Sequence, residues 1–177
     1  MLSALDQDLG FKPQGKRILV LGAGGACRAA IVALSRAGAS WLGIANRTVE
    51  RAEILVKEFR NFLPGTSFAS SNLDPLNLSP AFRQIDLLVN ASSVGLKGES
   101  FGDLPWEALP PSAGVYDMVY NLESTPLLNT ARARGHKAAD GLGMLAAQGE
   151  EAFFLWTGKK PPPGVMKAKL LMGGCPT

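Results

Sequence analysis

Three glycines, Gly22, Gly24 and Gly25, directly follow a run of apolar residues. Glycines between a buried strand and a helix let bare backbone approach a pyrophosphate, and the helix start offers free N–H groups and a positive dipole end. Gly22, Gly24, Gly25 and Ala26 are therefore candidate phosphate-contacting residues. The same glycines also suit an ordinary α/β turn, and the place usually held by a third Gly or Ala is Cys27.

A second polar group follows roughly 20 residues later, where dinucleotide-binding folds keep the side chain that reads the adenosine ribose. Asn46, Arg47 and Thr48 stand in sequence there, and Arg51 lies one turn further on. A carboxylate at this place selects NAD, whereas a guanidinium binds a 2′-phosphate through charge-assisted hydrogen bonds. The residues therefore predict a clamp for NADP. The alternative is that Arg47 and Arg51 are solvated surface residues.

A third polar stretch, Asn-Ala-Ser-Ser-Val-Gly, occupies residues 90–95 after another apolar run. In a sheet of order 3-2-1-4-5-6, the carboxyl ends of strands one and four flank the ligand crevice. Asn90 and Ser92 are therefore expected beneath the nicotinamide half of a dinucleotide. A structural turn that closes the strand explains the same residues and is compatible with that role.

Alternating apolar runs and amphipathic segments predict the elements that position these groups. We expect strands at residues 18–21, 41–45, 66–69, 86–89, 114–120 and 137–139, and helices at 25–37, 49–60, 125–135, 141–157 and 165–171. Proline, glycine and serine predict loops over residues 70–80 and 97–113. The result is an α/β fold of the Rossmann-like, doubly wound type, with a parallel sheet of about six strands and helices on both faces.

The helix expected at residues 141–157 has two faces of different character. Its predicted core stripe consists of Leu142, Leu145, Ala146, Gly149, Ala152, Phe153 and Trp156. A neighbouring face carries Gly141, Met144 and Gln148, which suits the wall of a cleft over a cofactor ring. The alternative is that Gln148 is an ordinary surface residue, which the spacing also allows.

Composition excludes several classes of protein. The 177 residues suffice for one domain with a substantial core, and 46% apolar with 19% charged residues is ordinary for a soluble protein. No apolar run approaches the ~20 residues of a membrane span, and residues 1–14 lack the apolar segment of a secretory signal. Two distant cysteines are most simply reduced thiols, so we expect a cytoplasmic chain. A net charge of +3 does not indicate nucleic-acid binding, and one histidine with two distant cysteines argues against a metal site.

Six motifs together resemble the C-terminal, NADP-binding domain of the shikimate dehydrogenase family, over nearly the whole chain. They are Gly-Ala-Gly-Gly-Ala at 22–26, Asn-Arg-Thr at 46–48 with Arg51, Val-Asn-Ala-Ser-Ser-Val-Gly at 89–95, Tyr-Asp-Met-Val-Tyr at 116–120, Thr-Pro-Leu-Leu at 125–128 and Asp-Gly-Leu-Gly-Met-Leu-Ala-Ala-Gln at 140–148. The first two also occur in relatives such as glutamyl-tRNA reductase, and the last three are specific to shikimate and quinate dehydrogenases. Leu122 departs from the family's usual proline.

The resemblance implies reversible hydride transfer between NADPH and 3-dehydroshikimate, which gives shikimate in aromatic amino-acid biosynthesis. It implies NADP as the cofactor and a small-molecule substrate. It assigns the 2′-phosphate clamp to Asn46, Arg47, Thr48 and Arg51. It assigns Gly141 and Met144 to the nicotinamide, Met118 to the cofactor site, and Tyr120 and Gln148 to the substrate.

The family's catalytic lysine and aspartate belong to an N-terminal domain that these residues do not contain. Neither Tyr116 nor Tyr120 has a lysine four residues later, and Lys97 and His136 have no evident partner that would make them a proton donor. We therefore expect no catalytic residue in this chain, and NADPH binding with negligible turnover.

The expected organisation has three parts. Residues 1–15 form an incoming interdomain helix or linker, or alternatively a frayed terminal helix; residues 16–158 form the NADP-binding domain; and residues 159–177 form a proline-rich turn and a short helix. Rival interpretations are a quinate/shikimate dehydrogenase or glutamyl-tRNA reductase relative, a stand-alone, non-catalytic NADP-binding or regulatory module, and a Rossmann-like domain without a ligand.

Overall fold

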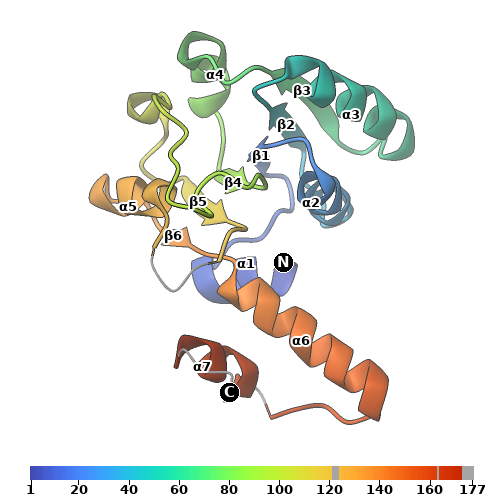
Figure 1. Ribbon diagram of the computed structural model, residues 1–177. Coiled ribbons are helices and arrows are strands. Elements are labelled where there is room, and N and C mark those ends of the chain that lie inside the picture. Colours follow the sequence, from blue (N-terminus) through green and yellow to red (C-terminus); the bar gives the residue numbers. More distant parts are fainter. Residues whose placement is uncertain (121–123, 163, 173–177) are drawn as a thin grey trace.

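The computed structural model describes residues 1–120, 124–162 and 164–172, so Leu122 lies outside the described residues. At its centre is a six-stranded parallel sheet of order β3-β2-β1-β4-β5-β6 (Figure 1). The strands are β1 (Arg17–Leu21), β2 (Trp41–Ala45), β3 (Ser67–Ser71), β4 (Leu87–Asn90), β5 (Gly114–Asp117) and β6 (Ala138–Ala139). The predicted Rossmann-like fold and its strand order are confirmed.

Helices cover both faces of the sheet, and the side chains of β1 show why its sequence is apolar throughout. Ile18 and Val20 enter a core beneath α1 (Leu2–Leu9), α2 (Gly25–Arg36) and α3 (Val49–Phe62). Leu19 and Leu21 enter a second core beneath α4 (Pro75–Phe82) and α5 (Pro126–Ala133). Successive side chains of a strand point to opposite faces, so a strand buried on both sides needs a continuous apolar run.

Helix α4 corrects the loop predicted over residues 70–80. Asp74 accepts a hydrogen bond from the Leu76 N–H at 2.8 Å, and Pro75 takes the first helical position. Leu78 and Phe82, one turn apart, are buried in the second core. An Asp-Pro pair therefore starts a helix here, because the carboxylate caps a free N–H and proline needs none.

The first half of α6 (Leu142–Thr157) packs near the sheet, and its second half extends away from it, with α7 (Val165–Leu171) alongside (Figure 1). Ala146 is buried, but Phe153 is 37% and Trp156 is 85% exposed. The predicted core stripe is therefore wrong for Phe153 and Trp156, because the helix runs beyond the sheet that it was expected to cover.

Helix α1 lies between the sheet and the C-terminal helices. Leu5 is buried in the first core, and Asp8 forms an ion pair with Lys167 of α7. Gly143 of α6 lies so close to Asp8 that a Cβ there would overlap the carboxylate. In the part of the chain that the structure describes, no helix has the length and apolar character needed to cross a membrane.

Candidate nucleotide-binding site

Two adjoining cavities open at the carboxyl ends of β1, β2 and β4. One, of about 470 Å³, is lined by residues 22–26 with Asn46, Arg51 and residues 91–93. The other, of about 570 Å³, is lined by Gly22, Asn46, Arg47, Arg51, Leu73, Ser92, Ser93, Val94, Glu99, Ser100 and Phe101. The structure thus brings together the glycine turn, the arginine cluster and the 90–95 turn, which are far apart in the sequence.

The glycine turn exposes backbone to the first cavity. Gly22 has a φ of 111°, and a Cβ added there would lie 3.0 Å from the carbonyl oxygen of Ala91, so only glycine fits without strain. Gly24 and Gly25 have no atom within 4 Å of an added Cβ, so their backbone borders open space. Because α2 begins at Gly25, its free N–H groups lie at this cavity, as phosphate binding requires.

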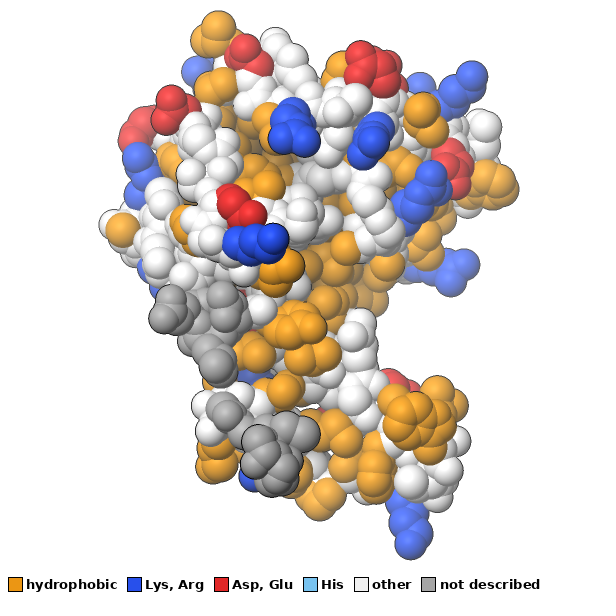
Figure 2. All heavy atoms as spheres, in the orientation of Figure 1, with side chains coloured by type: hydrophobic (Ala, Val, Ile, Leu, Met, Phe, Trp, Pro, Cys, Tyr) orange, Lys and Arg blue, Asp and Glu red, His pale blue; other side chains and the backbone are white. Residues whose placement is uncertain are grey.

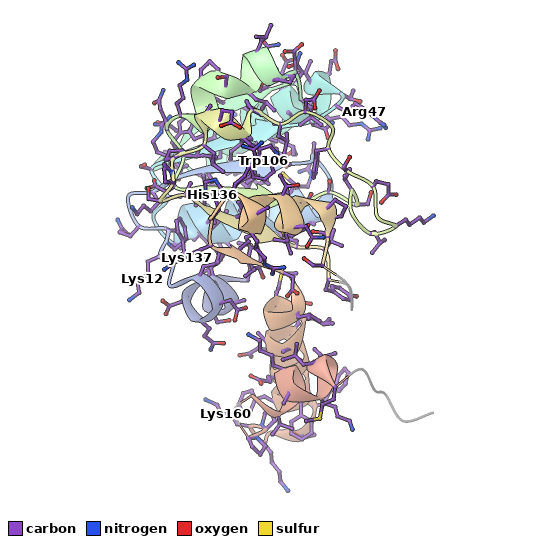
Figure 3. The ribbon with its side chains drawn as sticks, turned by 90° about the vertical axis from the view of Figure 1, so that its left-hand side faces the viewer. Lys12, Arg47, Trp106, His136, Lys137 and Lys160 are labelled. Atoms are coloured by element: carbon purple, nitrogen blue, oxygen red, sulfur yellow. The ribbon has the colours of Figure 1, made fainter. Side chains whose placement is uncertain are left out.

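Arg47 and Arg51 extend from the start of α3, and both are exposed. Among the residues that the structure describes, neither guanidinium forms an ion pair, whereas Arg28 pairs with Glu58 at 2.7 Å. In Figure 3, Arg47 lies at the opposite end of the molecule from Lys160, which follows α6. The two guanidinium groups at the second cavity are available to an anionic ligand.

Asn46 and Thr48 shape the segment between β2 and α3. The Asn46 side-chain amide donates to the Thr48 carbonyl oxygen at 2.8 Å. Thr48 occupies the N-cap position of α3, but its hydroxyl makes no capping hydrogen bond. The backbone N–H of Arg51 donates to the Thr48 carbonyl at 3.1 Å, which closes the first turn of α3.

The 90–95 turn is held by the side chain of Asn90, which is fully buried. Its carbonyl oxygen accepts from the Ser92 N–H at 2.9 Å and from the Ser92 hydroxyl at 2.7 Å. Its amide donates to the Val94 carbonyl at 2.9 Å and to the Asp117 carboxylate at 2.8 Å. The buried side chain of Asn90 therefore holds the turn in its conformation through these hydrogen bonds. Of the two residues predicted here, Ser92 lines both cavities and Asn90 lines neither.

Gly141 and Met144, which are expected at the nicotinamide, lie at the start of α6, and the predicted cofactor residue Met118 follows β5. Gly141 is buried and packs so closely on the Met118 carbonyl that a Cβ would not fit. Met118 and Met144 are half-buried and pack against the first core. Met118 and Gly141 therefore lie in contact, but neither they nor Met144 line either cavity at the glycine turn.

Tyr120 and Gln148, which are expected near the substrate, line neither of the two cavities at the glycine turn. Tyr120 is 49% exposed just beyond β5. Gln148 is exposed and lines a cavity of about 630 Å³ together with Ser3, Gln7 and Lys167. None of the residues lining that cavity lines either cavity at the glycine turn.

Sequence reasoning missed Glu99, Leu73 and Phe101 in the second cavity, and Asp117 beneath it. Glu99 accepts from the Lys97 N–H at 2.9 Å and from the Gly95 N–H at 3.3 Å. The Lys97 hydrogen bond in particular holds the pKa of Glu99 below its usual range. Of these four residues, only Asp117 could have been recognised from the sequence, because it is a carboxylate at the end of an apolar strand.

The His136 side chain contacts a backbone carbonyl group and an aromatic ring, neither of which could be inferred from the sequence. Its Nδ1 lies 3.2 Å from the Ala113 carbonyl oxygen, and the centroid of its ring lies 6.4 Å from that of Trp106. The side chain is buried and borders neither cavity at the glycine turn. Within the described ranges, no group of three His, Cys, Asp or Glu residues is arranged to bind a metal.

Cys27 is expected to be unreactive in the folded chain. Its side chain is fully buried in the first turn of α2, and burial raises the pKa of its thiol to about 12. Because the thiolate is the reactive form, a Cys175→Ser variant should show no fast labelling by a disulfide reagent at pH 8 and one thiol after denaturation. Fast labelling of the native variant would contradict this burial.

Comparison with known proteins places these features in a family. The model of shikimate / quinate 5-dehydrogenases matches residues 5–93, which is half of the chain, and the shikimate 5′-dehydrogenase C-terminal domain matches residues 141–171. A shikimate dehydrogenase (NADP(+)) of Geobacter sulfurreducens is 51% identical over 170 residues, which are 96% of this chain and 59% of the relative. The chain thus spans less than two thirds of the length of this relative.

Solved structures agree with this similarity. Shikimate 5-dehydrogenase of Thermus thermophilus, in complex with NADP(H) and shikimate, matches with a TM-score of 0.75 and 40% identity, over 94% of this chain and 58% of that one. The enzyme of Listeria monocytogenes, in complex with shikimate and NAD, matches with a TM-score of 0.84 and 31% identity, over 95% and 60%. The family-model match and the curated relatives together show that the chain belongs to the shikimate dehydrogenase family.

Proposed function

We propose that this chain is the NADP-binding part of a shikimate dehydrogenase, which interconverts 3-dehydroshikimate and shikimate. The observation that carries the proposal is the pair Arg47 and Arg51, which border a cavity beside the glycine turn and have no acidic partner among the described residues. An NAD site would place a carboxylate at this point, where it would repel a 2′-phosphate. The names of the relatives, which specify NADP(+), support the same cofactor.

The residues that line the two cavities fit the phosphates and the adenosine ribose of that cofactor. The backbone of residues 22–26 and the start of α2 would hold the pyrophosphate, and Asn46, Thr48 and the two arginines would hold the phosphorylated ribose. The 90–95 turn, Met118, Gly141 and Met144 would border the nicotinamide. When bound, NADPH supplies the hydride, and the chain's own residues bind and orient it.

Reduction of a ketone also needs a positioned proton donor, which we propose lies on a further part of the enzyme. The match covers 59% of the length of the Geobacter sulfurreducens relative, which leaves room for such a part. Phe154, Leu155 and Trp156 of α6 are exposed, and Figure 2 shows apolar side chains gathered on the lower part of the molecule. In this proposal, residues 16–158 form the NADP-binding domain, and residues 1–15 and 159–177 connect it to the further part of the enzyme. Tyr120 and Gln148 would face the substrate.

The test is a calorimetric titration of the 177-residue chain with NADPH and with NADH, followed by an activity assay. We expect NADPH to bind at least about tenfold more tightly, since its extra phosphate meets two guanidinium groups that form no ion pair within the described ranges. Turnover of 3-dehydroshikimate should be lower than that of a full-length relative by a factor of about 10² or more, the contribution of a general acid. Equal affinity for the two cofactors, or robust turnover by this chain, would refute the corresponding part of the proposal.

A further inference from the structure

A carboxylate with no exposure to solvent lies beneath the 90–95 turn, at the end of β5. Asp117 accepts hydrogen bonds from the Asn90 amide at 2.8 Å, the Val119 N–H at 3.0 Å and the Thr125 hydroxyl at 2.7 Å. Burial raises the pKa of Asp117, and the three donors, the Thr125 hydroxyl first among them, act against that rise. Its donors come from the end of β4, the segment after β5 and the start of α5, so one side chain joins three segments.

The bond to Asn90 connects Asp117 to the wall of the proposed cofactor site. Asn90 binds Ser92 and Val94, which line the second cavity. At the other end of the turn, Gly95 has a φ of 103°, and a Cβ added there would lie 3.4 Å from the Thr125 side chain. One end of the 90–95 turn is therefore hydrogen-bonded to Asp117, and the other end packs against Thr125.

The bond to Val119 connects Asp117 to the start of α6. The carbonyl oxygen of Val119 accepts a hydrogen bond from the Gly141 N–H at 3.3 Å, and the Met118 carbonyl packs on the same glycine. The position of the Val119 N–H thus sets the position of Met118 relative to Gly141. A buried, fully hydrogen-bonded carboxylate is suited to this, because moving any donor leaves a buried charge less well satisfied.

From these contacts we infer that Asp117 is a positioning residue for the nicotinamide end of the cofactor site. It lines neither cavity at the glycine turn, and it acts through Asn90 on the 90–95 turn and through Val119 on Met118. The adenosine end is held by residues 46–51, which none of these contacts reaches. The inference rests on the proposed function, because it takes NADPH as the ligand of the site.

The test compares NADPH with 2′,5′-ADP, which carries the adenosine and the 2′-phosphate but no nicotinamide. Asp117→Asn has the same shape without the charge, and it turns one acceptor toward Thr125 into a donor. We expect about a tenfold loss of NADPH affinity and a smaller change in nicotinamide fluorescence on binding, with 2′,5′-ADP affinity within about twofold of wild type. Equal losses for both ligands, or no loss for either, would overturn the inference.

Circular dichroism would show whether Asp117→Asn unfolds. A milder pair of variants at Thr125 tests the inference in that case. Thr125→Val removes a single donor to the carboxylate, and Thr125→Ser keeps the hydroxyl. We expect the valine variant to show the same selective loss for NADPH and the serine variant to match wild type. If both variants behave alike, Asp117 does not act through this bond and the inference fails. A wild-type chain that binds neither ligand refutes the proposed function itself, before any variant is compared.

Discussion

Arg47→Ala is expected to weaken NADPH binding about 10- to 150-fold and to leave NADH binding unchanged. That range corresponds to about 1.5–3 kcal/mol for hydrogen bonds to a charged group. Arg47 borders the second cavity but not the one at the glycine turn, so its loss should affect the 2′-phosphate and not the pyrophosphate. Calorimetric titration with each cofactor measures the difference.

Arg36→Ala is the matched control for this variant. Arg36 is exposed in the last turn of α2, at the end away from the glycine turn, and its replacement removes the same charge. It should leave both affinities within about twofold, because surface charges are screened beyond ~10 Å. An equal loss of NADPH and NADH affinity in Arg47→Ala would show that the guanidinium does not read the 2′-phosphate.

Gly22→Ala and Gly24→Ala are expected to fail in different ways, although both lie in the same turn. At Gly22 a methyl group would meet the Ala91 carbonyl at 3.0 Å and would require a φ of 111°, so we expect a loss of about 2–4 kcal/mol in the free energy of unfolding. At Gly24 the methyl group meets no protein atom within 4 Å and has an ordinary φ of −96°. Urea denaturation of each variant measures the stability.

Cofactor titration then separates the two glycines further. Gly24→Ala should keep its stability and bind NADPH at least about tenfold more weakly, because its methyl group enters the space in which we place the pyrophosphate. Gly65→Ala, another glycine with open space around its Cβ position, is the control and should change neither quantity appreciably. If Gly24→Ala binds NADPH as the wild type does, the pyrophosphate is not held at this turn.

Local periodicity predicts most of the elements correctly, because burial on two faces imposes a distinctive apolar pattern. The predicted strand at 41–45 coincides with β2, and the helix at 165–171 coincides with α7. The pattern misleads where burial depends on what lies opposite. Trp156 stands at core spacing in the sequence, yet it is 85% exposed, because α6 runs beyond the sheet. Helix α4 was missed because Asp-Pro signals both a turn and a helix start.

The sequence by itself determined the chemistry at each strand end: glycines that expose backbone, arginines in place of an acid, and a short polar turn. These depend on residue type and on spacing along the chain, which local physics governs. Only the tertiary structure decided that Asp117 meets Asn90 and Thr125, and that Gln148 faces a different cavity from the glycine turn. Such contacts depend on strand order, register and the direction in which a helix leaves the sheet, and these are set by the packing of the whole chain.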